Sequence, residues 1–272
     1  MRYQYVKPSA FLSDFVKHYW VLEIDEQEGH VAERVIPTGN IELMFHYRKP
    51  FAVINAENNS LSSQPLTVLS GLISGFSDVT SVGDSGVLAV SFHPFGACQF
   101  FNFPLAEIEN MSVDLRAVLG DKIRDIEEQL SNACHLTERI AIVEDFLKKA
   151  FCPLDAYDLA FLKKAVSLIE TSKAGIQAHE LADMLAVSNK GLERKFAARL
   201  GKTPKQYLKM MRFQMAVKRL SMANDQALTD LAYQCGYFDQ AHFIRDFKMF
   251  SGYTPGEFRQ ICNYQAQEGI VE

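Results

Sequence analysis

The sequence has no long run of apolar residues. A helix that crosses a membrane needs about 18 or more consecutive apolar residues, and no stretch of the 272 residues approaches that length. The N-terminal segment MRYQYVKPSAFLSDF also lacks the apolar core of a secretory signal peptide. We therefore expect a cytoplasmic protein without a membrane-spanning helix.

Cysteine is scarce as well. The five cysteines are odd in number, widely separated and never arranged as a CxxC pair; they are Cys98, Cys134, Cys152, Cys235 and Cys262. This pattern argues against a disulfide framework and against a cysteine-based metal site. We expect reduced thiols, most of them buried.

Motifs for metal binding and catalysis are absent. Six of the histidines show no HxxxH spacing and no pairing with cysteine; they are His18, His30, His46, His93, His135 and His179. Glu42 and His46 would share one face of a strand, but a structural histidine is favoured over a metal ligand there. No Ser/His/Asp or Cys/His arrangement can be proposed from the sequence. The sequence predicts no enzyme, no cofactor and no metal.

Charge is unevenly distributed along the chain. Residues 1–154 hold 12 Lys and Arg against 20 Asp and Glu, a net −8, whereas residues 155–261 hold 16 against 11, a net +5. A basic half joined to an acidic half favours nucleic acid as a partner. Between them, FCPLDAYD at 151–158 combines a proline with a fresh helix start. We place a domain boundary there, after residue 154.

The acidic half mixes strand and helix patterns. Apolar residues alternate at 41–45 and again at 88–92, which is typical of strands. The polar run NAENNSLSSQP around 55–65 predicts a surface loop between strands. Further along, apolar residues recur every three or four positions at 123–130 and 136–147, which predicts amphipathic helices. The first domain is therefore expected to be β-rich with two or more helices.

The basic half contains an internal repeat. Four small or apolar residues at helical spacing in 178–185 recur fifty residues later in 228–235. Eight further positions in 188–207 recur fifty-one residues later in 239–258, so one residue has been added in the intervening turn. Each copy is expected to form a short apolar helix, a tight turn and a second helix. The repeat predicts two similar helix-turn-helix modules.

The second helix of each module begins at a polar N-cap, Ser188 or Asp239, and ends at glycine. Between the modules, a long helix is predicted from Pro204 to Leu220, with Thr203 as its N-cap. Seventeen residues span roughly 26 Å at ~1.5 Å per residue, which is of the order of one DNA turn, ~34 Å. Two apolar stripes along this helix would let it contact both modules.

Two segments of the repeat, LADMLAVSNKGLERKFAARLGKTP and DLAYQCGYFDQAHFIRDFKMFSGYTPGEF, resemble the paired helix-turn-helix region of the AraC/XylS family of bacterial transcription regulators. The DQAHF string resembles one branch of that family, and so do DFVKHYW, RVIPTGNIEL and VSFHPFGA in the first half. The resemblance implies an α+β protein. It would have a β-rich, cupin-like or related sensor or dimerisation domain over 1–154, an all-α domain of two helix-turn-helix modules joined by a linker helix over 155–262, and a C-terminal tail over 263–272.

The resemblance also implies which side chains face DNA. The second helix of each module is expected to enter the major groove and to contact bases through Asn189, Lys190, Glu193, Arg194, Gln240, His242 and Arg245. A second set of basic residues is expected to contact phosphates: Arg199, Lys202, Lys205, Arg212 and Lys248. Within this set of helices, Gly191 weakens its own helix by ~1 kcal/mol relative to Ala.

The sequence therefore predicts a signal- or ligand-responsive transcription regulator that binds double-stranded DNA at two successive major-groove segments. The alternative is a small-molecule-binding or protein-interaction protein whose helical half does not act on DNA. Other expected partners are a small-molecule effector, RNA polymerase and a second copy of the chain. No effector-binding residue is identified, because a packed core is favoured over a pocket for the aromatic cluster Phe92, Phe95, Phe100, Phe101 and Phe103.

Overall fold

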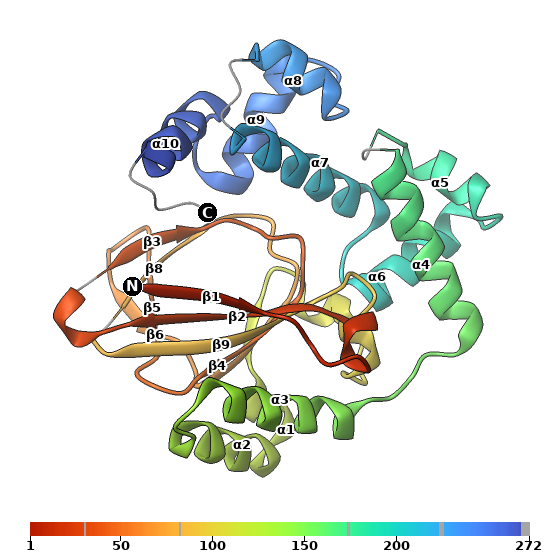
Figure 1. Ribbon diagram of the computed structural model, residues 1–272. Helices are drawn as coiled ribbons and strands as arrows, with labels where there is room; N and C mark the ends of the chain where they lie inside the picture. The colour runs from red at the N-terminus through yellow and green to blue at the C-terminus, as the bar shows by residue number, and fades with distance from the viewer. Residues whose placement is uncertain (30, 82, 173–174, 223–225, 268–272) are drawn as a thin grey trace.

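A strand-rich part of the chain is followed by a helical part. The computed structural model describes residues 1–29, 31–81, 83–172, 175–222 and 226–267, with side chains described as far as residue 262. All strands of the described residues lie between Arg2 and Asp114, and helices follow, as Figure 1 shows from red to blue. The predicted α+β class is confirmed.

Two antiparallel sheets make up the strand-rich part. The larger has the order β1 (Arg2–Val6), β2 (Val16–Ile24), β9 (Ser85–Phe92), β4 (Glu42–His46), β7 (Thr67–Ser70) and β10 (Ser112–Asp114). The smaller has the order β3 (Ala32–Val35), β8 (Ser77–Thr80), β5 (Ala52–Ile54) and β6 (Leu61–Ser63). The strands predicted at 41–45 and 88–92 are found as β4 and β9. The loop predicted at 55–65 is only partly a loop, because residues 61–63 form β6, an exposed edge strand paired with β5.

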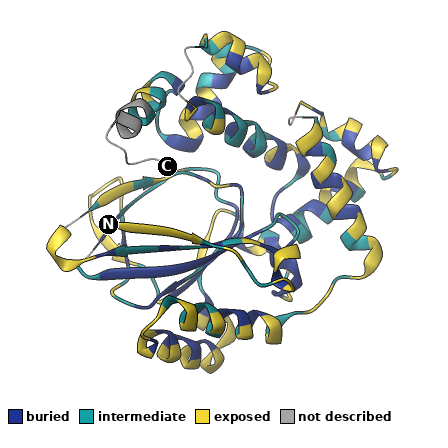
Figure 2. Cartoon of the chain, in the orientation of Figure 1, coloured by how far each residue is buried: buried dark blue, intermediate teal, exposed yellow. Residues whose placement is uncertain are grey.

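The core of this part is centred on β9. All eight residues of β9 are buried, because it lies between β2 and β4 and is covered on both faces (Figure 2). The Phe92 ring, at the end of β9, has its centroid 5.5 Å from that of Phe100 and 6.1 Å from that of Phe101. Phe95 and Phe103 are half-buried and pack against the same core. The aromatic cluster is therefore part of the packed interior.

Three helices follow the strands: α1 (Leu115–Leu119), α2 (Asp121–Asn132) and α3 (Leu136–Ala150). The two longer ones match the predicted helices at 123–130 and 136–147. The regularly spaced apolar residues of α2 are buried, and in α3 Val143 and Leu147 are buried while Leu136 and Ile140 are half-buried. Thr67 of β7 donates a buried hydrogen bond of 2.7 Å to Glu127 of α2, which ties this helix to the sheet.

The helical part contains α4 (Ala156–Thr171), α5 (Ala178–Met184), α6 (Asn189–Leu200), α7 (Pro204–Leu220), α8 (Leu228–Gln234), α9 (Gln240–Ser251) and α10 (Pro255–Gln267). The helix α10 continues to Gln267, across the predicted start of a C-terminal tail at residue 263, and that boundary stays a prediction. The rest of that predicted tail, residues 268–272, lies outside the described residues. The predicted domain boundary after residue 154 precedes α4 and stays a prediction.

The helical part packs against the strand-rich part at the end of α6. This end of the helix contacts two short 3-10 helices, η3 (Ala97–Gln99) and η4 (Leu105–Ile108). Gly201 ends α6 with φ +81°, and a Cβ built there would lie 2.9 Å from the backbone oxygen of Leu105. Only glycine satisfies both the left-handed backbone and the close approach. The backbone N–H of Cys152 donates to the Gln99 oxygen at 2.7 Å, close to the same contact.

The five cysteines are free thiols. Cys98 and Cys235 are buried, Cys262 is half-buried, and Cys134 and Cys152 are exposed. The expectation that most of them are buried is therefore wrong. Burial raises the pKa of Cys98 to about 12 and that of Cys235 to about 11, so both thiols are protonated at neutral pH.

Candidate nucleic-acid interface

The two modules are built alike. We define the first module as α5 and α6 and the second as α8 and α9. Ser188 Oγ accepts a hydrogen bond of 3.1 Å from the backbone N–H of Gly191, and Asp239 accepts one of 2.6 Å from the backbone N–H of His242. Each bond satisfies a backbone donor that the first turn of a helix leaves free. Both second helices are thus fixed at the end that was predicted to contact bases.

The helix α6 has one buried and one exposed face. Leu192, Phe196 and Leu200 are buried against the rest of the module. The predicted base-contacting residues of this helix are all exposed: Asn189, Lys190, Glu193 and Arg194. Three of them line an open hollow that continues to Thr203. Among the described residues, Arg194 has no ion-pair partner, so its guanidinium is available to a ligand.

The helix α9 has the same division. Phe243, Phe247 and Phe250 are buried, and Arg245 is exposed. Arg245 has no ion-pair partner among the described residues. Gln240 is half-buried, and its Oε1 accepts a hydrogen bond of 2.6 Å from the Thr229 hydroxyl of α8. Its amide N–H groups point to no described acceptor and are donors that a base can use.

His242 is tied into a network that the sequence analysis missed. Its Nε2 lies 3.1 Å from Oδ2 of the buried Asp246, one turn further along α9. Lys209 of α7 places its Nζ 2.9 Å from Oδ1 of the same carboxylate. This buried carboxylate therefore joins the second module to the linker helix, and His242 contributes to the joint as well as to the exposed face.

The predicted phosphate contacts occupy different environments. Lys205 and Lys248 are exposed. The Arg212 guanidinium lies 5.7 Å from the centroid of the Tyr237 ring. Arg199 places Nη2 3.4 Å from Asp158 of α4, which also pairs with Lys195. The Lys195 hydrogen bond is the main reason that the pKa of Asp158 is below its usual value.

Lys202 corrects the sequence prediction, because its side chain is 1 % exposed. Its Nζ donates to Ser74 Oγ at 2.7 Å, to Glu109 Oε1 at 2.9 Å and to Asn110 Oδ1 at 2.8 Å. Three acceptors use all three protons of an ammonium group. Burial lowers the pKa of Lys202, and the Glu109 carboxylate opposes that effect. In this conformation Lys202 joins the two parts of the chain and cannot reach a phosphate.

Arg34 makes a second junction, which the sequence analysis also missed. It forms a bidentate pair with Asp78, at 2.7 and 2.8 Å. Its guanidinium carbon lies 4.0 Å from the ring centroid of Phe76 and 4.6 Å from that of Tyr253, which follows α9. The strand-rich part thus contacts the second module as well as the first.

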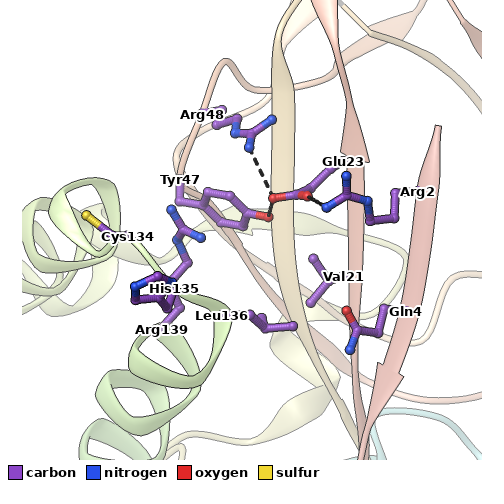
Figure 3. A pocket seen from close by; sticks show the side chains of 10 residues that line it. All are labelled: Arg2, Gln4, Val21, Glu23, Tyr47, Arg48, Cys134, His135, Leu136 and Arg139. Atoms are coloured by element: carbon purple, nitrogen blue, oxygen red, sulfur yellow. Dashed lines mark hydrogen bonds and ion pairs between the residues drawn. The ribbon is translucent and has the colours of Figure 1, made fainter.

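A polar pocket lies apart from these helices, between the larger sheet and the α2–α3 connection. Its volume is about 260 Å³. Glu23 is at its centre in Figure 3 and accepts hydrogen bonds from Tyr47 at 2.9 Å, Arg48 at 3.2 Å and Arg2 at 3.4 Å. Arg139 of α3 lies over the Tyr47 ring, 4.0 Å from its centroid. The pocket therefore combines several hydrogen-bond donors with one carboxylate.

Glu42 and His46 both lie in β4, but they form no metal centre with other described residues, which contain no group of three His, Cys, Asp or Glu suited to a metal ion. Burial raises the pKa of Glu42 to about 7 and lowers that of His46 to about 4. At neutral pH, His46 is therefore uncharged and Glu42 is about half protonated. No helix in the described ranges is long and apolar enough to cross a membrane.

Comparison with known proteins identifies the helical part. Residues 181–261 match the family model described as a helix-turn-helix domain, and residues 4–114 match a domain of unknown function, DUF6597. The HTH-type transcriptional activator RhaS of Enterobacter sp. (strain 638) is 35% identical over 80 residues, and that of Escherichia coli O1:K1 / APEC is 32% identical over 80 residues. These matches cover 29% of this chain and 28% of the relatives, so the chain spans just over a quarter of their length.

Similar solved structures include both partial and nearly complete matches. A transcriptional regulator from Chromobacterium violaceum, described as containing an AraC-type DNA-binding domain, is 27% identical, with a TM-score of 0.36 over 40% of this chain and 96% of that one. ToxT from Vibrio cholerae O395 is 12% identical, with a TM-score of 0.48 over 89% of this chain and 96% of that one. On these sequence matches, the helical part is a helix-turn-helix domain of the AraC/XylS type, as the sequence predicted.

Proposed function

We propose that this protein is a sequence-specific regulator of transcription that places α6 and α9 in two successive segments of the DNA major groove. The observation that carries the proposal is the pair of N-capped helices joined by one helix, α7. The polar residues at the N-terminal end are exposed in α6 and half-buried in α9, where Arg245 one turn later is exposed. In helix-turn-helix proteins this end of the second helix contacts base edges.

The chemistry of the exposed residues suits base recognition. Arginine can donate two hydrogen bonds to guanine O6 and N7, which is the role we assign to Arg194 and Arg245. Asn189 and Gln240 carry the amide group that pairs with adenine N6 and N7. The Glu193 carboxylate accepts a hydrogen bond from cytosine N4. Its negative charge is repelled by phosphate, which disfavours a position of this side chain beside the DNA backbone. Lys190 and His242 complete the proposed set.

Phosphate contacts come first from Lys205 and Lys248, since both are exposed and neither forms an ion pair with a carboxylate of the described residues. Arg212 and Arg199 add positive charge beside the two modules. Arg199 adds less, because it shares Asp158 with Lys195. Phosphate contacts of this kind position a protein on DNA without selecting a sequence.

Regulation of transcription is proposed from the relatives, since RhaS is named as a transcriptional activator. RNA polymerase is then a partner of the bound protein. A second copy of the chain is a further partner in this proposal. We include no catalytic role.

Responsiveness to a ligand is assigned to the polar pocket around Glu23. The positive charges of Arg2, Arg48 and Arg139 are balanced by three carboxylates. Glu23 pairs with Arg2 and Arg48, and Arg48 also has Asp84 Oδ1 at 2.9 Å and Asp25 Oδ1 at 3.6 Å. A small uncharged molecule with several hydroxyl or amide groups suits such a site better than an anion. The helix α3 contributes Arg139 to the pocket and leads to α4, so a ligand there would contact a helix connected to the first module.

The ligand assignment is tested by thermal denaturation with a panel of neutral polyols, sugars and amides, and a matched panel of carboxylates. We expect a neutral compound to raise the melting temperature of the wild-type protein and not that of Arg139→Gln. Stabilisation by carboxylates alone, or equal stabilisation of both proteins, would contradict the assignment.

The DNA-binding proposal is tested by selecting duplexes from a random pool with the full chain and measuring the affinity at several salt concentrations. Specific binding should weaken as salt increases, because bound protein releases counterions from phosphates. A variant with α7 lengthened by a few residues should bind the selected duplex much more weakly, since the second module would be rotated away from its groove. If the full chain shows no salt-dependent duplex binding, the alternative of a protein whose helical half does not act on DNA is favoured.

A further inference from the structure

The turns of the two modules match as far as Val187, the residue before the N-cap of α6. In the first module, the backbone N–H of Val187 donates to the Ala182 oxygen at 3.0 Å. In the second, the backbone N–H of Tyr237 donates to the Ala232 oxygen, also at 3.0 Å. The donors and the acceptors of these two bonds are each fifty positions apart, so the turns are equivalent as far as Val187 and Tyr237.

The N-caps that follow are fifty-one positions apart, at Ser188 and Asp239. The residue added in the second turn is therefore Phe238. Its side chain is 85% exposed, the largest value among the exposed large hydrophobic residues of the described chain. The first module has no counterpart for this aromatic ring.

The two neighbouring aromatic residues of this turn differ in burial. Tyr237 is 3% exposed, and its ring centroid lies 5.1 Å from that of Phe243. This buried ring anchors the turn in the module, while Phe238 extends into solvent. Among the described residues no ring or cation contacts Phe238. Full exposure of a phenyl group is unfavourable in water, so a surface that covers it would gain apolar contact.

The position of Phe238 identifies that surface. It directly precedes the N-cap of α9 and is two residues from Gln240, at the end of the helix that our proposed function places in the major groove. In that groove thymine presents its C5-methyl group, an apolar partner that protein side chains commonly contact. The backbone on both sides of Phe238 is held by hydrogen bonds of Tyr237 and Asp239, so the ring is presented from an ordered turn.

We propose that Phe238 contacts the C5-methyl group of a thymine in the DNA segment bound by the second module. This contact would give the second module an apolar element of specificity that the first lacks. The inference rests on the proposed function, and the competing occupant of an exposed ring, a protein partner such as RNA polymerase, is an outcome of the test below.

The test uses the full chain and a duplex selected as described above. Each thymine in the half of the site bound by the second module is replaced in turn by deoxyuridine, which lacks only the methyl group. For the wild-type protein, we expect the affinity to fall about fourfold at one position, the value for one buried methyl group. Phe238→Ala should bind the unmodified duplex several-fold more weakly and should be insensitive to deoxyuridine at that position. Phe238→Leu should keep part of the sensitivity.

Tyr5→Ala provides the matched control, because Tyr5 is also an exposed aromatic residue, 63% exposed, but lies in β1 of the strand-rich part. It should leave both affinity and sensitivity to deoxyuridine unchanged. If the wild-type protein binds no duplex specifically, the proposed function fails and this inference fails with it. If binding is specific but Phe238→Ala changes neither the affinity nor the sensitivity to deoxyuridine, the inference alone is overturned and a protein partner is favoured.

Discussion

Replacing Lys202 with methionine distinguishes a residue that joins two domains from one that contacts DNA. The Lys202 ammonium donates three hydrogen bonds to the strand-rich part, all between 2.7 and 2.9 Å. Methionine keeps most of the apolar stem and removes the charge. The perturbation is therefore confined to the polar end of a side chain that is otherwise fully packed.

The expected loss of unfolding free energy depends on how well the remaining Glu109 carboxylate is solvated. Removing one partner of a buried ion pair costs about 3–5 kcal/mol when the other is left without solvent. Glu109 is 28% exposed and still accepts a hydrogen bond of 2.9 Å from Gln206, so it can be rehydrated. We therefore expect a loss of about 2 kcal/mol, below that range. This corresponds to a decrease in melting temperature of about 4–8 °C.

The assay combines thermal denaturation with the salt dependence of duplex binding, and Lys205→Met is the matched control. Lys205 is exposed on the first turn of α7, so its replacement should leave the melting temperature unchanged and reduce the salt slope by about one unit. Lys202→Met should lower the melting temperature and leave the salt slope unchanged. A reduced salt slope with an unchanged melting temperature for Lys202→Met would refute the assignment of this residue to the domain junction.

Three further predictions concern the helical part. Arg194→Ala should weaken binding to the selected duplex by ~1–3 kcal/mol and weaken binding to random DNA less; equal weakening of both, with folding intact, would remove Arg194 from the base-contacting set. Because Lys195 and Arg199 keep the pKa of Asp158 low, their ion pairs stabilise the folded chain above the unfolded-state pKa near 4 and lose effect as pH falls through the depressed value. Urea denaturation across this acidic range should therefore show a steeper loss of stability for the wild type than for Asp158→Asn, and parallel curves would contradict this. Asp239→Ala removes an N-cap and should lower the unfolding free energy by about 1 kcal/mol in urea denaturation, whereas an unchanged value would mean that the cap contributes nothing.

The sequence predicted the elements whose signals are local. The apolar alternation at 41–45 and 88–92 was enough for β4 and β9, because one strand carries its own period. The repeat predicted both modules, because the small and apolar positions of one copy recur in the other, and Thr203 with Pro204 predicted the start of the helix between them. The N-caps Ser188 and Asp239 were predicted from residue type alone, and both accept the expected backbone hydrogen bond.

The contacts between the two parts of the chain were not predictable in the same way. Lys202 is bonded to residues 92, 93 and 128 positions away, and nothing in its neighbourhood distinguishes it from a solvated lysine. Arg34 is 44 positions from Asp78, and its contact with Tyr253 depends on the docking of the second module. For Phe238, the change of offset from fifty to fifty-one showed that a residue had been added, but only the matching turns identify which one.

The central claim is that one chain contacts two successive segments of the major groove through α6 and α9. The most direct test is a footprint of the full chain on its selected duplex and on a duplex with five base pairs inserted between the two protected segments. Two protected segments about one helical turn apart are expected, and the insertion should sharply weaken binding because it rotates one segment to the opposite side of the DNA. A single protected segment, or unchanged affinity after the insertion, would contradict the account.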